Sequence, residues 1–263
     1  MNPDINRLAN EIVYVCHKLA EYEFVAATDG NVSARIDGGR MLVTPTSLPK
    51  GEVTVDDLII CDMDGNKLEG KSRASTEVRM HVEAYRRRDD INAIVHAHPI
   101  TATAFTVADI SLSECVLPEV VFSIGSIQTC PYATPGTEEV PRSVATMVEK
   151  TDALLLERHG VLTLGVTPTK ALHKMEKVEH TAKVVFMARQ LGGARPLASH
   201  EVEKLMEVRR KLELPGRVVS CPEGSPCALP IETMYASEAD DQPNEQERLI
   251  EEVVLKVVQA MKR

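Results

Sequence analysis

The 263-residue chain has no tryptophan and few other aromatic residues, with five tyrosines and four phenylalanines. Hydrophobic residues still make up 43% of the chain, so its core must be built from aliphatic side chains. No apolar run approaches the ~20 residues of a membrane-spanning helix. The N-terminus also lacks the basic and then apolar layout of a signal peptide. We therefore expect a cytoplasmic protein with no membrane partner.

Positive charge is not in excess either. The formal net charge is −9 and the basic residues are scattered, which argues against a nucleic-acid partner. An anionic substrate would have to be held by local donors. The six cysteines are dispersed, which favours reduced, mostly buried thiols. Cys221 and Cys227 flank a Pro/Gly loop, and the spacing leaves open whether they form a redox pair, a small metal clip or neither.

The length suits one α/β domain with an extension, or two small domains. In the early segments apolar and polar residues alternate, as is typical of antiparallel strands. Later segments include both strand-like runs and runs with helical periodicity. The pattern predicts helices over 4–21, 77–88, 99–107, 138–149 and 168–191, and strands over 41–44, 58–62, 93–98, 153–159 and 161–166, with one or two irregular strands within 116–127.

The most informative stretch is Ala93-Ile94-Val95-His96-Ala97-His98-Pro99. Two histidines one residue apart on a strand project to the same face, so both imidazoles can bind one ion. His159 follows a second apolar strand and would supply a third ligand. Glu77 opens a predicted helix and would be a base or a displaceable fourth ligand. Three imidazoles and a movable carboxylate are typical of a catalytic zinc site. Hydrogen-bonded structural histidines are the alternative.

Three polar loops could bind a phosphate through backbone N–H groups and hydroxyls. Gly30-Asn31 lies in a turn, Thr46-Ser47 follows a strand, and Ser75-Thr76 precedes the helix of Glu77. The first N–H groups of a helix lack internal partners, which makes its start an anion site. An ordinary turn and a simple helix cap are the alternatives for the first and last of these loops.

Several motifs occur in a fixed order along the chain. They are Gly-Asn-Val-Ser at 30–33, Thr-Pro-Thr at 44–46, Ser-Thr-Glu at 75–77, His-Ala-His-Pro at 96–99, Pro-Tyr-Ala-Thr-Pro-Gly-Thr at 131–137 and Arg-His-Gly at 158–160. Together they resemble the zinc-dependent class II aldolase and adducin family, and among its members the L-fuculose-1-phosphate aldolases most of all. The likeness covers residues 1–214.

The resemblance implies a three-layer α/β/α domain with a mainly antiparallel sheet, assembled as a homotetramer with active sites between subunits. His96, His98 and His159 would bind one Zn²⁺ per subunit, and Glu77 would be the catalytic carboxylate. The implied reaction is reversible cleavage of a ketose 1-phosphate to dihydroxyacetone phosphate and a short aldehyde such as lactaldehyde, through an enediolate that zinc stabilises. The phosphate would be held by Gly30, Asn31, Thr46, Ser47, Ser75 and Thr76.

Other members of the family remain alternatives. L-Ribulose-5-phosphate 4-epimerase typically has aspartate where this chain has Glu77, whereas methylthioribulose-1-phosphate dehydratase shares the motif set. An adducin-like scaffold without activity is disfavoured because all three histidines are present. Two positions depart from the aldolases: Ser47 stands where glycine is usual, and Leu117 to Phe122 replaces a region with a catalytic tyrosine. The acid that protonates the aldehyde oxygen is therefore unassigned, with Tyr235 or a zinc-bound water as candidates.

The remaining residues differ in composition from the domain. Residues 215–243 read as a Pro/Gly/Cys-rich and then acidic linker. Residues 244–263 predict a helix with one apolar stripe, too short to be stable without a docking surface. We expect it to dock either on its own oligomer or on a shell protein, since linker plus helix resembles the encapsulation peptides of bacterial microcompartment enzymes.

Overall fold

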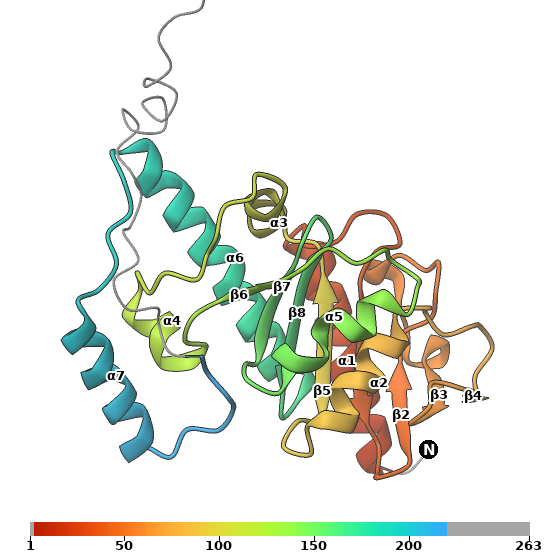
Figure 1. Ribbon diagram of the computed structural model, residues 1–263. Helices are drawn as coiled ribbons and strands as arrows, with labels where there is room; N and C mark the ends of the chain where they lie inside the picture. Colours follow the sequence, from red (N-terminus) through yellow and green to blue (C-terminus); the bar gives the residue numbers. More distant parts are fainter. Residues whose placement is uncertain (1–2, 220–263) are drawn as a thin grey trace, which may run out of the picture.

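The computed structural model describes residues 3–219 and is built around one eight-stranded sheet (Figure 1). The strand order is β4-β3-β2-β1-β5-β8-β7-β6. Within the described residues, neighbouring strands are antiparallel except β6 and β7, which run parallel. The strands are β1 (Asn31–Arg35), β2 (Arg40–Val43), β3 (Ile59–Asp62), β4 (Lys67–Glu69), β5 (Ala93–Ala97), β6 (Gln128–Cys130), β7 (Ala153–Leu156) and β8 (Gly160–Gly165).

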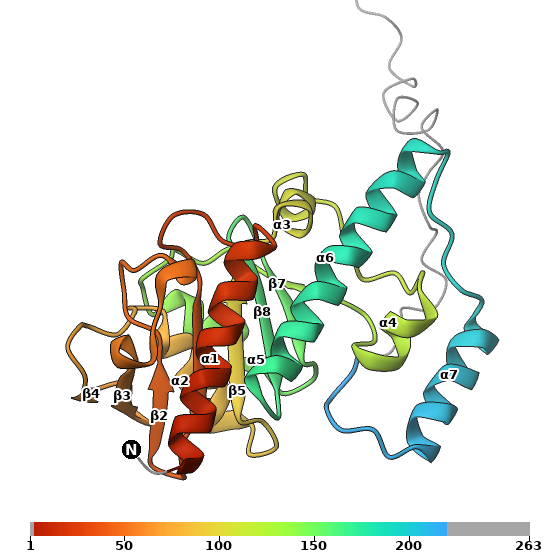
Figure 2. The same cartoon turned by 180° about the vertical axis from the view of Figure 1, so that it is seen from behind.

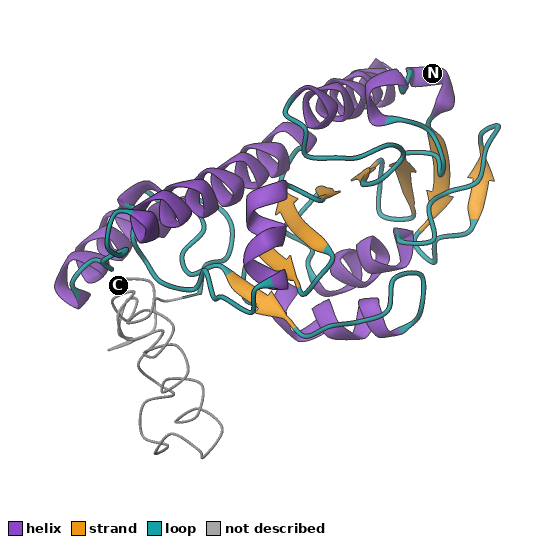
Figure 3. Cartoon of the chain, turned by 90° about the horizontal axis from the view of Figure 1, so that it is seen from above, coloured by secondary structure: helices purple, strands orange, loops and turns teal. Residues whose placement is uncertain are grey.

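Helices cover both faces of the sheet, which gives three layers (Figures 1, 2 and 3). One face packs against α1 (Pro3–Glu21), α3 (Ile100–Val107) and α6 (Pro168–Gln190). The other packs against α2 (Val78–Arg87) and α5 (Glu139–Val148). This arrangement confirms the expected α/β/α fold with a mainly antiparallel sheet. Two short 3₁₀ helices, η1 (Lys50–Glu52) and η2 (Val55–Asp57), connect β2 to β3.

The alternation of side chains along β5 separates the two cores. Ala93, Val95 and Ala97 belong to the core under α1 and α6, whereas Ile94 belongs to the core under α2 and α5. By the same alternation His96 projects toward α2 and α5. The first metal-ligand candidate therefore points to the side of the sheet on which α2 begins.

The prediction of strands within 116–127 is wrong. Residues Pro118–Ser123 form a short helix, α4, and only the following residues 128–130 form a strand. Pro118 stands at the first helical position, where its fixed φ suits a helix and its missing N–H costs nothing. Val120 and Val121 are buried there, so tertiary packing overrides the β propensity of this run. Helix α7 (Ser199–Lys211), which packs against α4, was not predicted.

Cys16, Cys61 and Cys130 are free and buried, as expected for reduced thiols. Cys115 departs from that expectation because its sulfur is disulfide-bonded. Cys221, Cys227, Tyr235 and the predicted helix 244–263 lie outside the described residues, so these predictions remain untested. No helix among residues 3–219 is long and apolar enough to cross a membrane.

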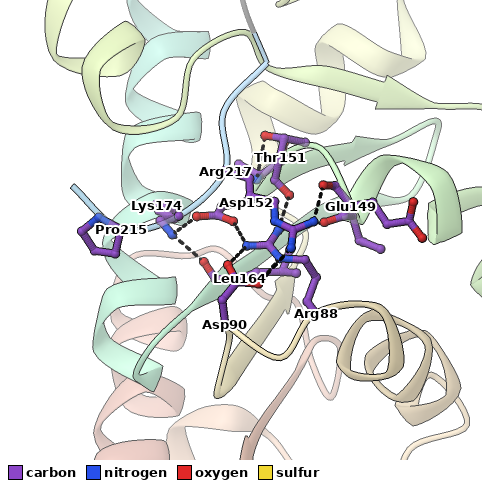
Figure 4. A network of polar contacts seen from close by, with 12 residues as sticks. Arg88, Asp90, Glu149, Thr151, Asp152, Leu164, Lys174, Pro215 and Arg217 are labelled. Atoms are coloured by element: carbon purple, nitrogen blue, oxygen red, sulfur yellow. Dashed lines mark hydrogen bonds and ion pairs between the residues drawn. The ribbon is translucent and has the colours of Figure 1, made fainter. Parts of the chain in front are cut away.

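A buried ionic network lies at the end of the sheet where β5 begins (Figure 4). The guanidinium of Arg88 is fully buried and pairs with Asp90 at 2.6 Å and Asp152 at 2.7 Å. The ammonium of Lys174 on α6 donates to the other oxygen of Asp152 at 2.7 Å. Backbone from residues 215–219 joins here, since Asp152 N donates to Arg217 O. The start of the predicted linker therefore packs on the domain.

Candidate metal centre and active site

Antiparallel pairing brings the candidate ligands together at the opposite end of β5. His96 is registered against Asn31, the first residue of β1. Ala97 is registered against Val161, near the start of β8. His159 lies in the turn between β7 and β8, not at a strand end as predicted, and that turn reaches the same place. Strand ends far apart in the sequence thus meet around one point.

The three predicted ligands form a compact cluster. One nitrogen from each of His96, His98 and His159 can be chosen so that all lie within 4.8 Å of one another. Nε2 of His96 and Nε2 of His98 are 3.0 Å apart. The ring centroids are 4.7 to 5.2 Å apart. His96 is buried, whereas His98 and His159 open onto a pocket, so a bound ion would remain accessible to a substrate.

The hydrogen bonds of the rings suit a metal. Nδ1 of His96 lies 2.9 Å from the carbonyl oxygen of Val161, which can only accept, so the ring proton is on Nδ1 and Nε2 carries a lone pair. Nδ1 of His98 faces the carboxylate of Asp29 at 3.5 Å, the usual partner of a metal-bound histidine. Two Nε2 lone pairs at 3.0 Å repel unless a cation lies between them. The donor set therefore fits a zinc ion.

Burial also favours the neutral form of two of these rings, those of His96 and His98. It lowers the pKa of His96 to about 3, against the attraction of Glu77. Burial and the neighbouring His159 lower the pKa of His98 in the same direction. A histidine must be neutral to bind a metal, so the lowered pKa values of His96 and His98 favour the form that binds an ion.

Glu77 stands beside the cluster at the N-terminus of α2. Its Oε1 is 2.9 Å from Nε2 of His159, and its Oε2 is 3.6 Å from Nε2 of His96. The amide of Asn31 donates to Oε2 at 2.6 Å. Burial opposes ionisation, but His96, His159 and Asn31 outweigh it and hold the pKa of Glu77 below its usual range. The group is therefore a carboxylate, held close enough to act as a base or to approach an ion.

Two glycines allow the backbone to pass close to the histidines. A Cβ at Gly160 would lie 2.5 Å from the carbonyl oxygen of Ala97 and 2.6 Å from Cδ2 of His98. A Cβ at Gly30 would lie 2.9 Å from the carbonyl oxygen of His96, and φ there is +74°. Any larger residue at either position would displace a ligand.

The predicted phosphate loops line the same pocket, whose volume is about 400 Å³. Five of their six residues contribute to its wall: Gly30, Thr46, Ser47, Ser75 and Thr76. Asn31 is 2% exposed and does not line the pocket; its amide is occupied by Glu77. Ser47 has φ +58°, which explains why glycine suits this position.

Three further residues belong to the site and were not predicted from the sequence. Asp29 lies beside Gly30 and faces His98, and its place before a Gly-Asn turn was an available signal.

His81, one helical turn after Glu77, is fully buried, and its Nδ1 is 2.7 Å from Ser33 Oγ. Burial lowers the pKa of His81 to about 4. Lys50 lies beneath two of the pocket loops, with no signal in the sequence.

The fold and the site define an α/β protein with a three-histidine metal site and an adjacent carboxylate. A match over residues 10–186 to the model for the class II aldolase and adducin N-terminal domain agrees with this definition. The chain belongs to the class II aldolase and adducin family. It is a class II aldolase, an aldehyde-lyase, as the motifs predict.

Known relatives span most of the described chain. An L-fuculose phosphate aldolase of Methanococcus maripaludis is 35% identical over 181 residues, which cover 69% of this chain and 97% of that protein. One from Escherichia coli is 34% identical over 196 residues, covering 74% of this chain and 90% of that protein. A solved L-fuculose 1-phosphate aldolase superposes with a TM-score of 0.73 at 29% identity, covering 81% of this chain and 98% of that one.

Proposed function

We propose that this enzyme is a zinc-dependent aldolase that reversibly cleaves a deoxyketose 1-phosphate, such as L-fuculose 1-phosphate, to dihydroxyacetone phosphate and lactaldehyde. The observation that carries the proposal is the composition of one pocket. His98, His159 and Glu77 lie on its wall together with the hydroxyl-bearing loops of Thr46 and Ser75. The names of the relatives support the choice of substrate.

The polar loops would hold the phosphate. The hydroxyls of Thr46, Ser47, Ser75 and Thr76 can donate to phosphate oxygens, and Gly30 presents backbone without a side chain in the way. The pocket also lies at the N-terminus of α2, where the helix dipole favours an anion. Held at this end, the ketose would extend its carbonyl toward the histidines.

His96, His98 and His159 would hold one Zn²⁺ per subunit. A bound zinc ion would act as a Lewis acid toward the substrate carbonyl, which typically contributes several kcal/mol to such a reaction. Asp29 and the carbonyl of Val161 would orient the rings of His98 and His96 from behind.

Glu77 would move the proton at the carbon next to the carbonyl. Its carboxylate is ionised, partly buried and held by Asn31, so its position is fixed before substrate binds. In the cleavage direction the carbon that loses its bond must gain a proton, and in the condensation direction it must lose one. A positioned general acid or base typically contributes ~10²–10⁴-fold to the rate.

We assign no acid for the aldehyde oxygen to α4. The only hydroxyl between Leu117 and Ser123 is that of Ser123, and no residue of this segment lines the pocket within one chain. The group would have to come from a neighbouring subunit, from solvent or from a part of the chain beyond residue 219.

A homotetramer would supply such a neighbour. Large apolar side chains are exposed along α3 and the adjoining end of α6, a pattern typical of a surface covered by another copy. They are Ile100, Val107, Phe186, Met187 and Leu191. Light scattering that gives the mass of four chains would support this assembly, and a monomer at assay concentration would contradict it.

Turnover of candidate substrates tests the proposed function. Purified enzyme would be assayed with L-fuculose 1-phosphate, L-rhamnulose 1-phosphate, L-ribulose 5-phosphate and methylthioribulose 1-phosphate. We expect dihydroxyacetone phosphate and lactaldehyde from the first at the highest kcat/KM. Epimerised or dehydrated product from either of the last two would favour those alternatives. Absence of any turnover in protein that contains zinc would favour a scaffold of the adducin type.

A further inference from the structure

A buried lysine lies directly beneath the loops of the pocket. Lys50 begins the 3₁₀ helix η1, and it is only 1% exposed although lysine is rarely buried without a paired charge. Its ammonium forms no ion pair with any carboxylate in the part of the chain that the structure describes. Burial lowers the pKa of Lys50, and the carboxylates of Asp29 and Glu77 act on it only from a distance.

The hydrogen bonds of Lys50 connect two loops. Its Nζ donates to the carbonyl oxygen of Thr28 at 2.9 Å and to that of Leu48 at 2.9 Å. Thr28 precedes Asp29 and Gly30 in one wall of the pocket, whereas Leu48 follows Ser47 in another. One ammonium therefore fixes the separation of two walls that are 20 residues apart in sequence.

A buried cation without an adjacent anion is costly, and the cost falls when an anion binds nearby. The pocket above Lys50 is where a phosphate would bind, and a phosphate group carries between one and two negative charges at neutral pH. Asp29 contributes a carboxylate to one of these loops, and their remaining polar side chains in the pocket wall are neutral hydroxyls. No lysine or arginine among the described residues lines this pocket, so the nearby ammonium of Lys50 would supply positive charge to an anion bound there.

We propose that Lys50 is a positioning residue that sets the two phosphate loops and supplies the positive charge that selects phosphorylated substrates. The inference rests on the proposed function, since it assigns the phosphate to this end of the pocket. Lys50 acts through the loops that it holds, because its ammonium already donates to the two carbonyls.

Two substitutions separate the roles of charge and hydrogen bonding. Lys50→Met removes both, whereas Lys50→Gln removes the charge and keeps a side-chain donor for the carbonyls. Lys67→Met is a matched control, because Lys67 also donates to two backbone carbonyls, those of Gly70 and Ser72, but lies exposed on β4. Zinc content and thermal unfolding of each variant would establish that it folds and keeps its ion.

The primary readout is binding of inorganic phosphate, measured by calorimetry on the zinc-loaded enzyme, which does not depend on turnover. We expect phosphate affinity to fall by about tenfold or more in Lys50→Met, to a smaller extent in Lys50→Gln, and not in Lys67→Met. With a ketose 1-phosphate as substrate, KM should rise by a similar factor while kcat changes little. Cleavage of the unphosphorylated ketose should be unaffected.

Equal phosphate affinity in folded Lys50→Met and wild type would overturn the inference, as would a wild-type enzyme that binds no phosphate. A loss of kcat without a change in KM would also contradict it, because that result indicates a distorted metal site. The proposed function is tested separately: if wild type binds phosphate in a Lys50-dependent manner but cleaves no ketose phosphate, the inference about Lys50 stands and the choice of reaction fails.

Discussion

Gly160→Ala should damage the metal site while leaving every ligand in place. The added Cβ would lie 2.5 Å from Ala97 O and 2.6 Å from His98 Cδ2, whereas ordinary contact begins at 3.4 Å. The ring of His98 or the end of β5 must therefore move by roughly 0.8 Å, several times the ~0.2 Å tolerance of a metal–ligand distance. We expect zinc affinity to fall by about 10–100-fold, with a stability loss of about 1–3 kcal/mol.

Zinc affinity would be measured by competition with a chromogenic chelator, and stability by urea unfolding of the metal-free protein. Gly38→Ala is the control, because a Cβ there meets nothing within 4 Å. A folded Gly160→Ala protein with wild-type zinc affinity and activity would refute the reasoning. It would mean that the close approach of β8 to His98 does not set the geometry of the site.

Two further predictions concern Glu77, which caps α2, and His81 within that helix. The Glu77→Gln variant should keep its zinc, since three histidines remain, but its kcat/KM should fall by about 10²–10⁴-fold. A kcat/KM within tenfold of wild type would mean that another residue is the base. His81 is neutral and buried, and burial lowers its pKa from 6.5 to about 4. It therefore stabilises the fold above pH 6.5, and the free energy of unfolding should fall by about 3 kcal/mol as the pH decreases from 6.5 toward 4. Urea unfolding of the metal-free protein at several pH values would measure this dependence, which should be weaker in His81→Gln. The same slope of unfolding free energy against pH in wild type and variant would contradict the prediction.

The sequence identified most residues of the site, but it did not reveal the strand pairings that bring them together. His96 and His98 could be assigned to one face because strand alternation is a local property, and the motifs placed Glu77 and His159 with them. The three-layer fold was predicted from the resemblance of the same motifs to the class II aldolase and adducin family. Pairing of β5 with β1 and β8, which brings these residues together, depends on contacts between distant segments and leaves no local pattern.

The failures have a similar cause. Residues 116–127 are rich in β-branched side chains, but burial against α6 and α7 and the proline at position 118 favour a helix. The contact of the Asn31 amide with Glu77 joins residues 46 positions apart, so no local pattern reveals it. Lys50 looks like an ordinary surface lysine after a proline, and only the packing of the two loops reveals that its ammonium is buried.

The proposed function requires that His96, His98 and His159 bind one divalent ion on which activity depends. The most direct test is elemental analysis of the purified enzyme combined with activity before and after dialysis against a chelator. We expect one zinc per chain, loss of activity with loss of zinc, recovery on adding zinc back, and no tight zinc in a folded His96→Ala variant. Full activity in protein that contains no metal would contradict it.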